Sequence, residues 1–415
     1  MNQFEPTISL EEALGIVDST LTEVKPVGER APVRSALGRV IVADQRSRLD
    51  LPPFDKAAMD GYAVLAGDVR DEYRILETVP AGYVGTQPLT PGTAIKVMTG
   101  AAIPDGTGKI VMLEHAEERA DRVRVLKQEG APNICWKGED VRVGDVVLAA
   151  ATVLGPLAIA NLIACGITQV EVARRPRVAI LSTGDEIVDS ADALLPGKIM
   201  NSNGPMLAAL AAQHGMEVVC EESVPDEREA TESAIAAAVR DSDITILSGG
   251  VSVGEYDFVL GAMEAAGLAV HFSRIAAQPG KPTVYATGSF GAKSLPKHST
   301  HCGAVFGLPG NPVSVFLMFH LFVLRVADRM AGKRPERREV VLPLASQFRR
   351  KKADRVSFVP ARMTEKGAVE SVSFHGSAHL AALMSADGFM RVPAGVTELA
   401  EGDEVVFLPI IGGAR

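Results

Sequence analysis

Carboxylates and glycines gather in short polar segments in the middle of the chain. Asp185 and Glu186 lie in the segment STGDE, and Glu255 and Asp257 lie in SGGVSVGEYDF. Mg²⁺ in proteins takes one or two carboxylate oxygens and shares its remaining positions with water and ligand phosphate. Carboxylates beside glycine loops therefore predict a metal-assisted reaction on a phosphorylated ligand.

Two of the carboxylates in this part of the chain also have a purely structural explanation. Asp226 is followed three residues later by Glu229, and this spacing predicts a capping box that starts a helix reaching Arg240. Asp257 stands where another helix is expected to begin, so both helix capping and metal binding stay open for it.

Four glycine-containing loops follow predicted strands. Backbone N–H groups in such loops and at helix N-termini favour anions, and the carboxyl ends of parallel strands share one edge of a sheet. The loops are Ser182–Glu186, Ser248–Glu255, Gln278–Pro282 and Gly307–Pro312. No GxGxxG follows a strand and no GxxxxGK[ST] occurs, which argues against an ordinary NAD site or a P-loop ATPase.

The elements that must position these loops differ in kind along the chain. Strand and helix signals alternate from Arg177 to Met330, which predicts a largely parallel sheet with helices on both faces. Residues 7–24 have helical spacing, and residues 33–147 show short β-rich runs followed by a helix over 156–165. Residues 331–415 have the pattern of a small β-barrel or sandwich.

Composition narrows the class of protein. The chain has 415 residues, with 42 Lys and Arg against 51 Asp and Glu, a formal charge of −9. This acidic balance argues against broad nucleic-acid binding, which depends on neutralising phosphates. The longest apolar run, Val313–Leu324, is too short to span a bilayer. The widely spaced cysteines and the absence of a signal-like N-terminus predict reduced thiols and a cytoplasmic location.

Seven segments occur in a fixed order, and together they identify a family. From about Ile8 to Phe407, the chain resembles the MoeA family of molybdenum cofactor biosynthesis, which includes the E domain of gephyrin. The segments are PPFDKAAMDGYAV, MTGAAIPDG, GED, STGDE, SGGVSVGEYDF, PGKP and GLPGNPVS. The resemblance implies a molybdopterin molybdenumtransferase that inserts molybdate into adenylylated molybdopterin and releases AMP, with Mg²⁺.

The resemblance also implies a multidomain α/β plus β fold and a homodimer. Its parts would be a discontinuous N-terminal mixed domain (1–45 and 141–172), a β-rich inserted domain (46–140), a three-layer α/β molybdopterin-binding domain (173–330) and a small C-terminal β-barrel (331–415). The α/β domain of one chain would face the β-rich arm of the other. Transient contacts with other molybdenum cofactor enzymes or with apo-molybdoenzymes are expected. Binding to nucleic acid or to a membrane is not expected.

Family roles carry over onto matching positions of this sequence. The catalytic positions are Asp60, Thr99, Asp140, Glu186, Asp226, Asp257 and Lys281, and Glu186, Asp226 and Asp257 would hold the metal. The substrate-binding positions are Ser182, Gly184, Ser248, Gly249, Gly250, Ser252, Arg274, Gln278, Gly280, Pro282, Pro309, Pro312, Arg355 and Ser377. Lys281, Arg355 and nearby donors suit a tetrahedral dianion such as molybdate, because charge-assisted hydrogen bonds favour it.

The chain departs from the family pattern at charged positions. Gln278 stands where relatives usually have Lys, and Cys135 and Trp136 stand in a stretch that is usually Arg-rich, whereas Arg274 is retained. Fewer positive charges would weaken anion binding or shift the choice between molybdate and tungstate. The basic run 349–352 has the pattern of a solvated face that raises the local anion concentration.

Histidines near two of these segments could line a site or lie on the surface. His298, His301 and Cys302 belong to an apparent insertion and are interpreted as part of a surface loop, because no fourth metal ligand accompanies them. His375 and His379 flank Ser377, which makes a pocket-lining role reasonable for them.

Two other functions stay open from the sequence. The missing charges also fit a non-catalytic molybdopterin-binding scaffold that has lost turnover. A molybdopterin adenylyltransferase is a further alternative, because related α/β domains perform that step, although those enzymes lack the β-rich arms.

Overall fold

The computed structural model describes residues 7–128, 130–250, 259–288, 303–334 and 339–410. Its contacts divide the chain into two compact units, one made of Met1–Glu29 with Ala173–Arg415 and the other of Arg30–Val172. Within the described residues, no helix has the length and apolar character needed to cross a membrane.

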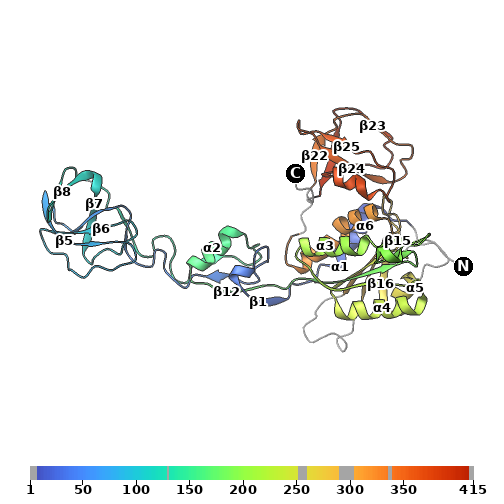
Figure 1. The fold of residues 1–415 in the computed structure, drawn as a ribbon, viewed down its shortest axis with the longest axis horizontal. Coiled ribbons are helices and arrows are strands. Elements are labelled where there is room, and N and C mark those ends of the chain that lie inside the picture. Colours follow the sequence, from blue (N-terminus) through green and yellow to red (C-terminus); the bar gives the residue numbers. More distant parts are fainter. Residues whose placement is uncertain (1–6, 129, 251–258, 289–302, 335–338, 411–415) are drawn as a thin grey trace. The chain divides into compact units, whose positions relative to one another are not determined.

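A six-stranded sheet forms the centre of the first unit (Figure 1). Its order is β16 (Glu217–Val224), β13 (Arg177–Thr183), β17 (Ile244–Ser248), β21 (Gly303–Leu308), β20 (Val284–Gly288) and β18 (Leu268–Phe272). The first four strands are parallel, and β20 runs antiparallel to both of its neighbours. The expected largely parallel sheet is therefore confirmed, with β20 as the strand that reverses.

Helices cover both faces of this sheet, which makes three layers (Figure 1). Val178 and Ile180 of β13 pack towards one layer, and Ala179 and Leu181 pack towards the other, because successive side chains alternate along a strand. The first layer contains α1 (Leu10–Thr20), α3 (Asn203–Gln213), α6 (Pro312–Met318), a π-helical turn (Phe319–Val323) and α7 (Leu324–Met330). The second contains α4 (Arg228–Asp241) and α5 (Val259–Ala265).

Helix α1 belongs to the α/β core, although residues 1–45 were expected in the N-terminal mixed domain. Ser9 caps it by accepting a hydrogen bond from the N–H of Glu12, as the capping-box spacing predicts. Its buried face, which includes Leu10 and Leu14, packs in the same core as α3 and α6. Asp18 accepts hydrogen bonds from the Arg325 guanidinium of α7, so α1 is also tied to this layer at its surface.

The C-terminal β domain pairs directly with a strand of the α/β domain. Strand β19 (Ala277–Gln278) runs parallel to β24 (Val356–Met363), and Gln278 is the register partner of Ser357. The sheet continues through β26 (Gly388–Val392), β28 (Glu404–Pro409) and β22 (Val340–Pro343), with β25 (Val369–Ser371) on β24. A separate pair, β23 (Phe348–Arg349) and β27 (Glu398–Leu399), and the 3₁₀ segment Leu380–Ser385 complete the domain.

The segment before β19 is held by backbone hydrogen bonds from two distant parts of the chain. Ile8 donates its N–H to the carbonyl of Arg274 and accepts from the N–H of Ala276 at 2.7 Å. Val356 of β24 donates its N–H to the carbonyl of Ala276 at 3.2 Å. The chain's N-terminal segment and its C-terminal domain therefore both bind to this short segment.

The second unit contains a six-stranded sheet with a hydrophobic cluster on each face and a separate cluster around a helix. Its six-stranded sheet has the order β7 (Thr107–Met112), β4 (Gly61–Leu65), β6 (Thr93–Val97), β5 (Glu72–Val79), β9 (Arg122–Val125) and β8 (Ala116–Arg119). Helix α2 (Pro156–Ala164) packs instead with residues from both 31–51 and 141–172. Short pairs complete this unit: β1 (Gly28–Pro32) with β12 (Gln169–Ala173), β2 (Gln45–Arg46) with β11 (Val146–Leu148), and β3 (Lys56–Ala57) with β10 (Ile134–Cys135).

Candidate functional site

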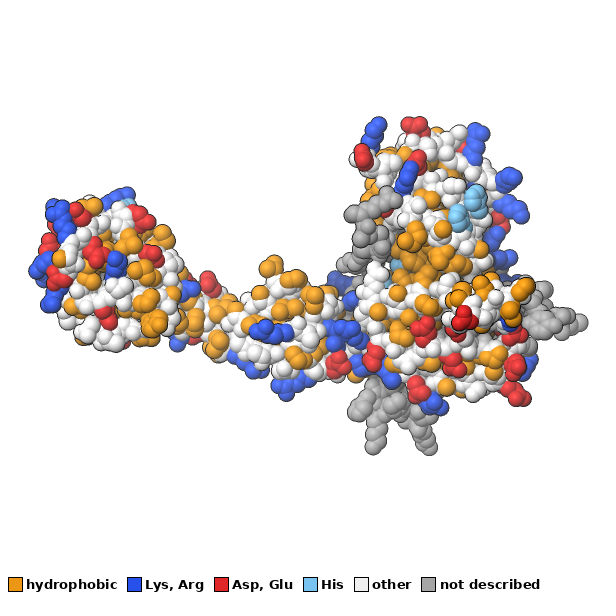
Figure 2. Space-filling view, in the orientation of Figure 1, with side chains coloured by type: hydrophobic (Ala, Val, Ile, Leu, Met, Phe, Trp, Pro, Cys, Tyr) orange, Lys and Arg blue, Asp and Glu red, His pale blue; other side chains and the backbone are white. Residues whose placement is uncertain are grey.

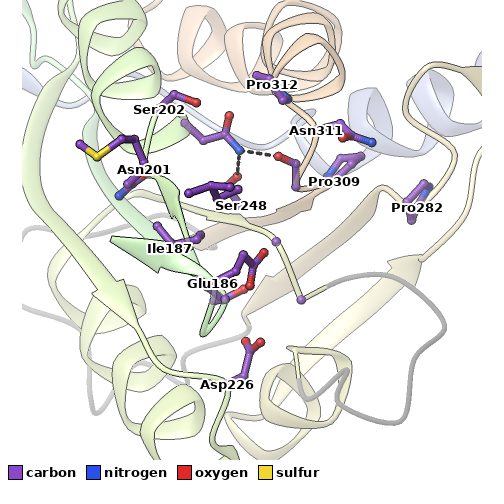
Figure 3. A pocket seen from close by; sticks show the side chains of 18 residues that line it. Glu186, Ile187, Asn201, Ser202, Asp226, Ser248, Pro282, Pro309, Asn311 and Pro312 are labelled. Atoms are coloured by element: carbon purple, nitrogen blue, oxygen red, sulfur yellow. Dashed lines mark hydrogen bonds between the residues drawn. The ribbon is translucent and has the colours of Figure 1, made fainter. Parts of the chain in front are cut away.

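A cavity of about 300 Å³ opens at the carboxyl ends of β13 and β17, beside the start of α3 and α6 (Figure 3). This is where parallel α/β sheets place their ligands. Many of the predicted site residues line it: Gly184, Glu186, Asp226, Ser248, Gly249, Gly250, Pro282, Pro309 and Pro312. An apolar edge is added by β14 (Ile187–Val188) and β15 (Ile199–Met200), which pair in parallel.

Glycine is required at two places in this cavity wall. Gly249 has a φ of +97°, and a Cβ there would lie 2.3 Å from the carbonyl oxygen of Thr183. Gly184 has a φ of +141°, and a Cβ there would lie 2.6 Å from the Glu186 carboxylate. Only glycine tolerates both the positive φ and the close approach, so these residues let the two loops pack tightly in the cavity wall.

The carboxylates of this cavity repel one another. Asp226 donates its N–H to Oδ1 of Asp185 and accepts from the N–H of Asp185 through Oδ2, at 3.1 and 3.4 Å. Loss of water raises the pKa of Asp226 above its ordinary value of 3.8, and the charges of Asp185 and Glu186 add to this effect. A cation bound here would relieve the repulsion.

The prediction that Asp226 caps a helix is wrong. Helix α4 begins at Arg228, and its N-cap residue is Glu227, which makes no capping hydrogen bond through its side chain. The Asp226 side chain lines the cavity instead and is bound to the STGDE loop. The carboxylate that seemed structural from its spacing thus lies in the candidate site.

Asn203 holds the cavity wall together and was missed by the sequence analysis. Its Nδ2 donates to Oγ of Ser248 at 2.8 Å and to the carbonyl of Gly310 at 2.7 Å, shown as dashed lines in Figure 3. Asn201, which also lines the cavity, accepts from Oγ of Ser182 at 3.2 Å, so Ser182 lies behind the wall. Their signal in the sequence is the polar run NSN, residues 201–203, where α3 begins.

A second cavity of about 600 Å³ lies between the α/β domain and the C-terminal β domain. Five predicted site residues line this cavity and not the first one: Gln278, Gly280, Lys281, Arg355 and Ser377. Pro282, Pro309 and Asn311 line both cavities, so the two spaces adjoin. The N–H of Val313, at the start of α6, donates to the carbonyl of Ser377 and so fixes this part of the C-terminal domain.

Among the described residues, this second cavity is lined by five cationic side chains and no carboxylate. The cations are Lys281, Arg350, Lys351, Lys352 and Arg355. Within the basic run that was expected to form a solvated face, Lys351 and Lys352 are exposed, Arg350 is half-buried in the lining, and Arg349 pairs with Glu398 outside it. The sequence could not show this lining, because the cavity forms only where the two domains meet. On the visible face of the molecule, apolar side chains gather where these two domains meet (Figure 2).

Several predicted residues lie elsewhere. Arg274 lines neither cavity, and its backbone pairs with Ile8. His375 and His379 stack at 5.3 Å between ring centroids without lining either cavity. Ser252, Asp257 and the His298, His301 and Cys302 insertion lie outside the described residues.

In the second unit, Asp60 and Thr99 are joined. Oδ1 of Asp60 accepts from both Oγ1 and the N–H of Thr99, at 2.7 and 2.6 Å. These hydrogen bonds lower the pKa of Asp60, with the Thr99 side chain contributing most. Asp140 donates its N–H to the carbonyl of Leu51, next to Gly138 with its φ of +69°.

Metal-binding capacity is limited to pairs of acids in the part of the chain that the structure describes. Among those residues, no group of three or more His, Cys, Asp or Glu side chains is placed to hold a metal ion. Glu186 and Asp226 line one cavity, and this donor set suits Mg²⁺, which needs only one or two protein carboxylates beside a ligand phosphate.

Comparisons with known proteins cover nearly the whole chain. Three family descriptions match in order: the MoeA N-terminal region (domain I and II) over residues 8–166, a "Probable molybdopterin binding domain" over 179–329, and the MoeA C-terminal region (domain IV) over 342–410. Relatives named molybdopterin molybdenumtransferase include one from Staphylococcus aureus strain Mu50, 31% identical over 90% of this chain and 89% of the relative.

Another relative of that name, from Staphylococcus epidermidis strain RP62A, is 30% identical over 96% of this chain and 94% of its own length. Among solved structures, a molybdopterin biosynthesis MoeA protein from Pyrococcus horikoshii is 30% identical, with a TM-score of 0.80. That match covers 98% of this chain and 100% of the other. With both sequence and structure matched along almost their full lengths, this chain belongs to the MoeA family.

Proposed function

We propose that this protein is a molybdopterin molybdenumtransferase, which inserts molybdate into adenylylated molybdopterin and releases AMP. The observation that carries the proposal is the pair of adjoining cavities, one acidic and one basic, with Pro282, Pro309 and Asn311 in common. A ligand that carries phosphates needs a metal at one end, and a molybdate dianion needs cations at the other. The family membership and the names of the relatives support the same reaction.

In this proposal, Glu186 and Asp226 hold Mg²⁺ at the acidic cavity, with Asp257 as a further ligand. The metal would draw charge from the ligand phosphates and so make AMP a better leaving group. Gly184 and Gly249 allow the tight loop packing that shapes the cavity, and Asn203 keeps the two walls of the cavity at a fixed separation.

At the basic cavity, Lys281, Arg355 and Ser377 hold molybdate beside the reacting sulfur atoms of the pterin. Lys281 and Arg355 supply charge, and hydroxyl and N–H donors complete the tetrahedral anion's hydrogen bonds. The residues common to both cavities support this arrangement, in which the anion would lie next to the metal-bound phosphate end and both substrates would be held at once.

The test is to mix purified protein with adenylylated molybdopterin, Mg²⁺ and molybdate. AMP release is measured together with the reconstitution of an apo-molybdoenzyme. We expect AMP release that requires both molybdate and Mg²⁺. Tight pterin binding with no AMP above background would contradict the enzyme and favour a scaffold.

We further propose a cytoplasmic homodimer that hands its product to other molybdenum cofactor enzymes or to apo-molybdoenzymes. Asp60, Thr99 and Asp140 would act from the β-rich arm of one subunit on the α/β domain of its partner. Light scattering at micromolar concentration is expected to give the mass of a dimer, and a monomer there would contradict this arrangement.

A further inference from the structure

Arg350 lies in the wall of the basic cavity and is held by four hydrogen bonds. Its Nε donates to the carbonyl of Val396 at 2.6 Å, and its Nη1 donates to the carbonyl of Arg355 at 3.0 Å and to Oγ of Ser357 at 2.5 Å. Its Nη2 donates to the carbonyl of Pro393. A guanidinium has five N–H groups, so one remains for a ligand.

All four acceptors of Arg350 are neutral. No carboxylate forms an ion pair with Arg350 among the residues that the structure describes, and the nearby Asp354 is bound instead to Arg355 at 3.2 Å. Partial burial lowers the pKa of Arg350, which Asp354 only partly offsets. Because an arginine stays protonated far above neutral pH, the side chain keeps its charge. Arg350 is therefore a fixed cation without a paired counter-ion.

The position of this cation is set by the pairing of two strands. Ser357 of β24, which accepts from Arg350, is the register partner of Gln278 in β19. Gln278 is neutral and exposed, and it lines the same cavity as Arg350. Arg350 is therefore connected to Gln278 through Ser357, which is the residue opposite Gln278 in the β19–β24 pair.

We propose that Arg350 supplies the fixed positive charge that binds a tetrahedral oxyanion dianion beside Gln278. This inference rests on the proposed function and names a residue that determines its anion affinity. Lys351 and Lys352 are exposed, so ordering their side chains around an anion costs more conformational entropy. The Arg350 guanidinium is already held in place. The anion accepts the remaining N–H and serves as the counter-ion that the protein does not provide.

The experiment measures binding of sodium molybdate to the full-length protein by calorimetry at low salt. Arg350→Gln removes the charge, and we expect the Kd to rise about tenfold. Adding Gln278→Lys to that variant returns a cation to the other side of the ladder, and we expect the Kd to fall back to within about threefold of wild type. A structural role alone would not be rescued from position 278.

Two further variants separate charge from packing. Arg350→Lys keeps the charge but not the fork, and we expect its Kd to stay within about threefold of wild type while its melting temperature falls. Arg349→Gln is the matched control, because Arg349 is the adjacent residue, has the same charge and pairs with Glu398 outside the cavity. We expect no change in its Kd.

The outcomes are distinguishable. Wild-type protein that binds no molybdate would overturn both the proposed function and the role of Arg350. Equal Kd values for wild type and folded Arg350→Gln would overturn only the role of Arg350. If the Gln variant unfolds, the Lys variant decides the question. A folded Arg350→Lys protein whose Kd rises about tenfold, and does not fall when Gln278→Lys is added, would also overturn the role of Arg350.

Discussion

The two cavities adjoin, yet their charges are opposite. Among the residues that the structure describes, the acidic cavity is lined by Glu186 and Asp226 and by no Lys or Arg, whereas the basic cavity is lined by five cations and no carboxylate. In most proteins, charges this close are paired, because a buried or crowded charge without a partner is costly. Apart from Arg355, which pairs with Asp354, the charges of each cavity suit a ligand of the opposite sign.

The difference also reflects which parts of the chain build each cavity. The acidic one is formed at strand ends and helix starts of the α/β domain, where backbone geometry alone favours ligands. The basic one needs side chains from the C-terminal domain, brought in by a two-residue strand pairing. The first cavity follows from a common fold, and the second depends on how this chain joins two domains.

The largest effect is expected from removing an acid. Glu186→Gln takes a negative charge from the metal site, and we expect AMP release at saturating molybdate to fall by about 100-fold, equivalent to ~3 kcal/mol of barrier. The Kd for molybdate should stay the same, because the anion binds in the other cavity. Glu264→Gln, an exposed acid of α5, is the matched control. A parallel loss of molybdate affinity would show that the two cavities are not separate in function.

A smaller effect is expected from removing a cation. Lys281→Ala should raise the molybdate concentration for half-maximal AMP release by about tenfold, because it removes one charge-assisted hydrogen bond worth ~1.5 kcal/mol. The rate at saturating molybdate should change little, and added salt should narrow the difference by screening the remaining charges. Lys366→Ala, exposed in the C-terminal domain, is the control. An unchanged molybdate requirement would place the anion elsewhere.

The smallest effect concerns stability. Because the pKa of Asp226 is raised in the folded protein, its ionised form costs stability at pH 7. Asp226→Asn should therefore raise the Tm by about 2 °C at pH 7 while lowering activity. The gain should shrink as the pH falls through the raised pKa towards 3.8, since the wild-type carboxyl is then neutral too. Thermal melts from pH 7 to pH 4 measure this, and a Tm below wild type at pH 7 would contradict the repulsion.

Much of the α/β domain could be predicted from local patterns. The strands of the sheet, the helix starting after Ser9 and the glycine loops at strand ends all follow from periodicity and turn residues. Asp226 was misassigned because a carboxylate three residues before another acid has the same local sequence pattern in two situations. It can cap a helix, or it can form hydrogen bonds with a loop that follows a neighbouring strand. The distinction depends on Asp185, which lies 41 residues earlier in the sequence.

The basic cavity was harder to predict because its contacts are long-range. Arg349 and Arg350 are neighbours of the same type, yet one pairs with Glu398 at the surface and the other lines the cavity. Their partners lie far along the chain, because Arg349 is opposite Glu398 in the β23–β27 pair and Arg350 donates to the carbonyls of Pro393 and Val396. Asn203 was missed for a similar reason, because its partners Ser248 and Gly310 lie far along the chain.

The segment 274–276 has a consequence for biosynthesis. Its partners are Ile8, near the start of the chain, and Val356, so its hydrogen bond to Val356 cannot form until translation has passed residue 356. An emerging α/β domain would have the partner Ile8 but not the strand β24, and the basic cavity would be assembled only after the C-terminal domain had been synthesised. A nascent chain stalled before that point would have the strands that border the acidic cavity but no oxyanion site.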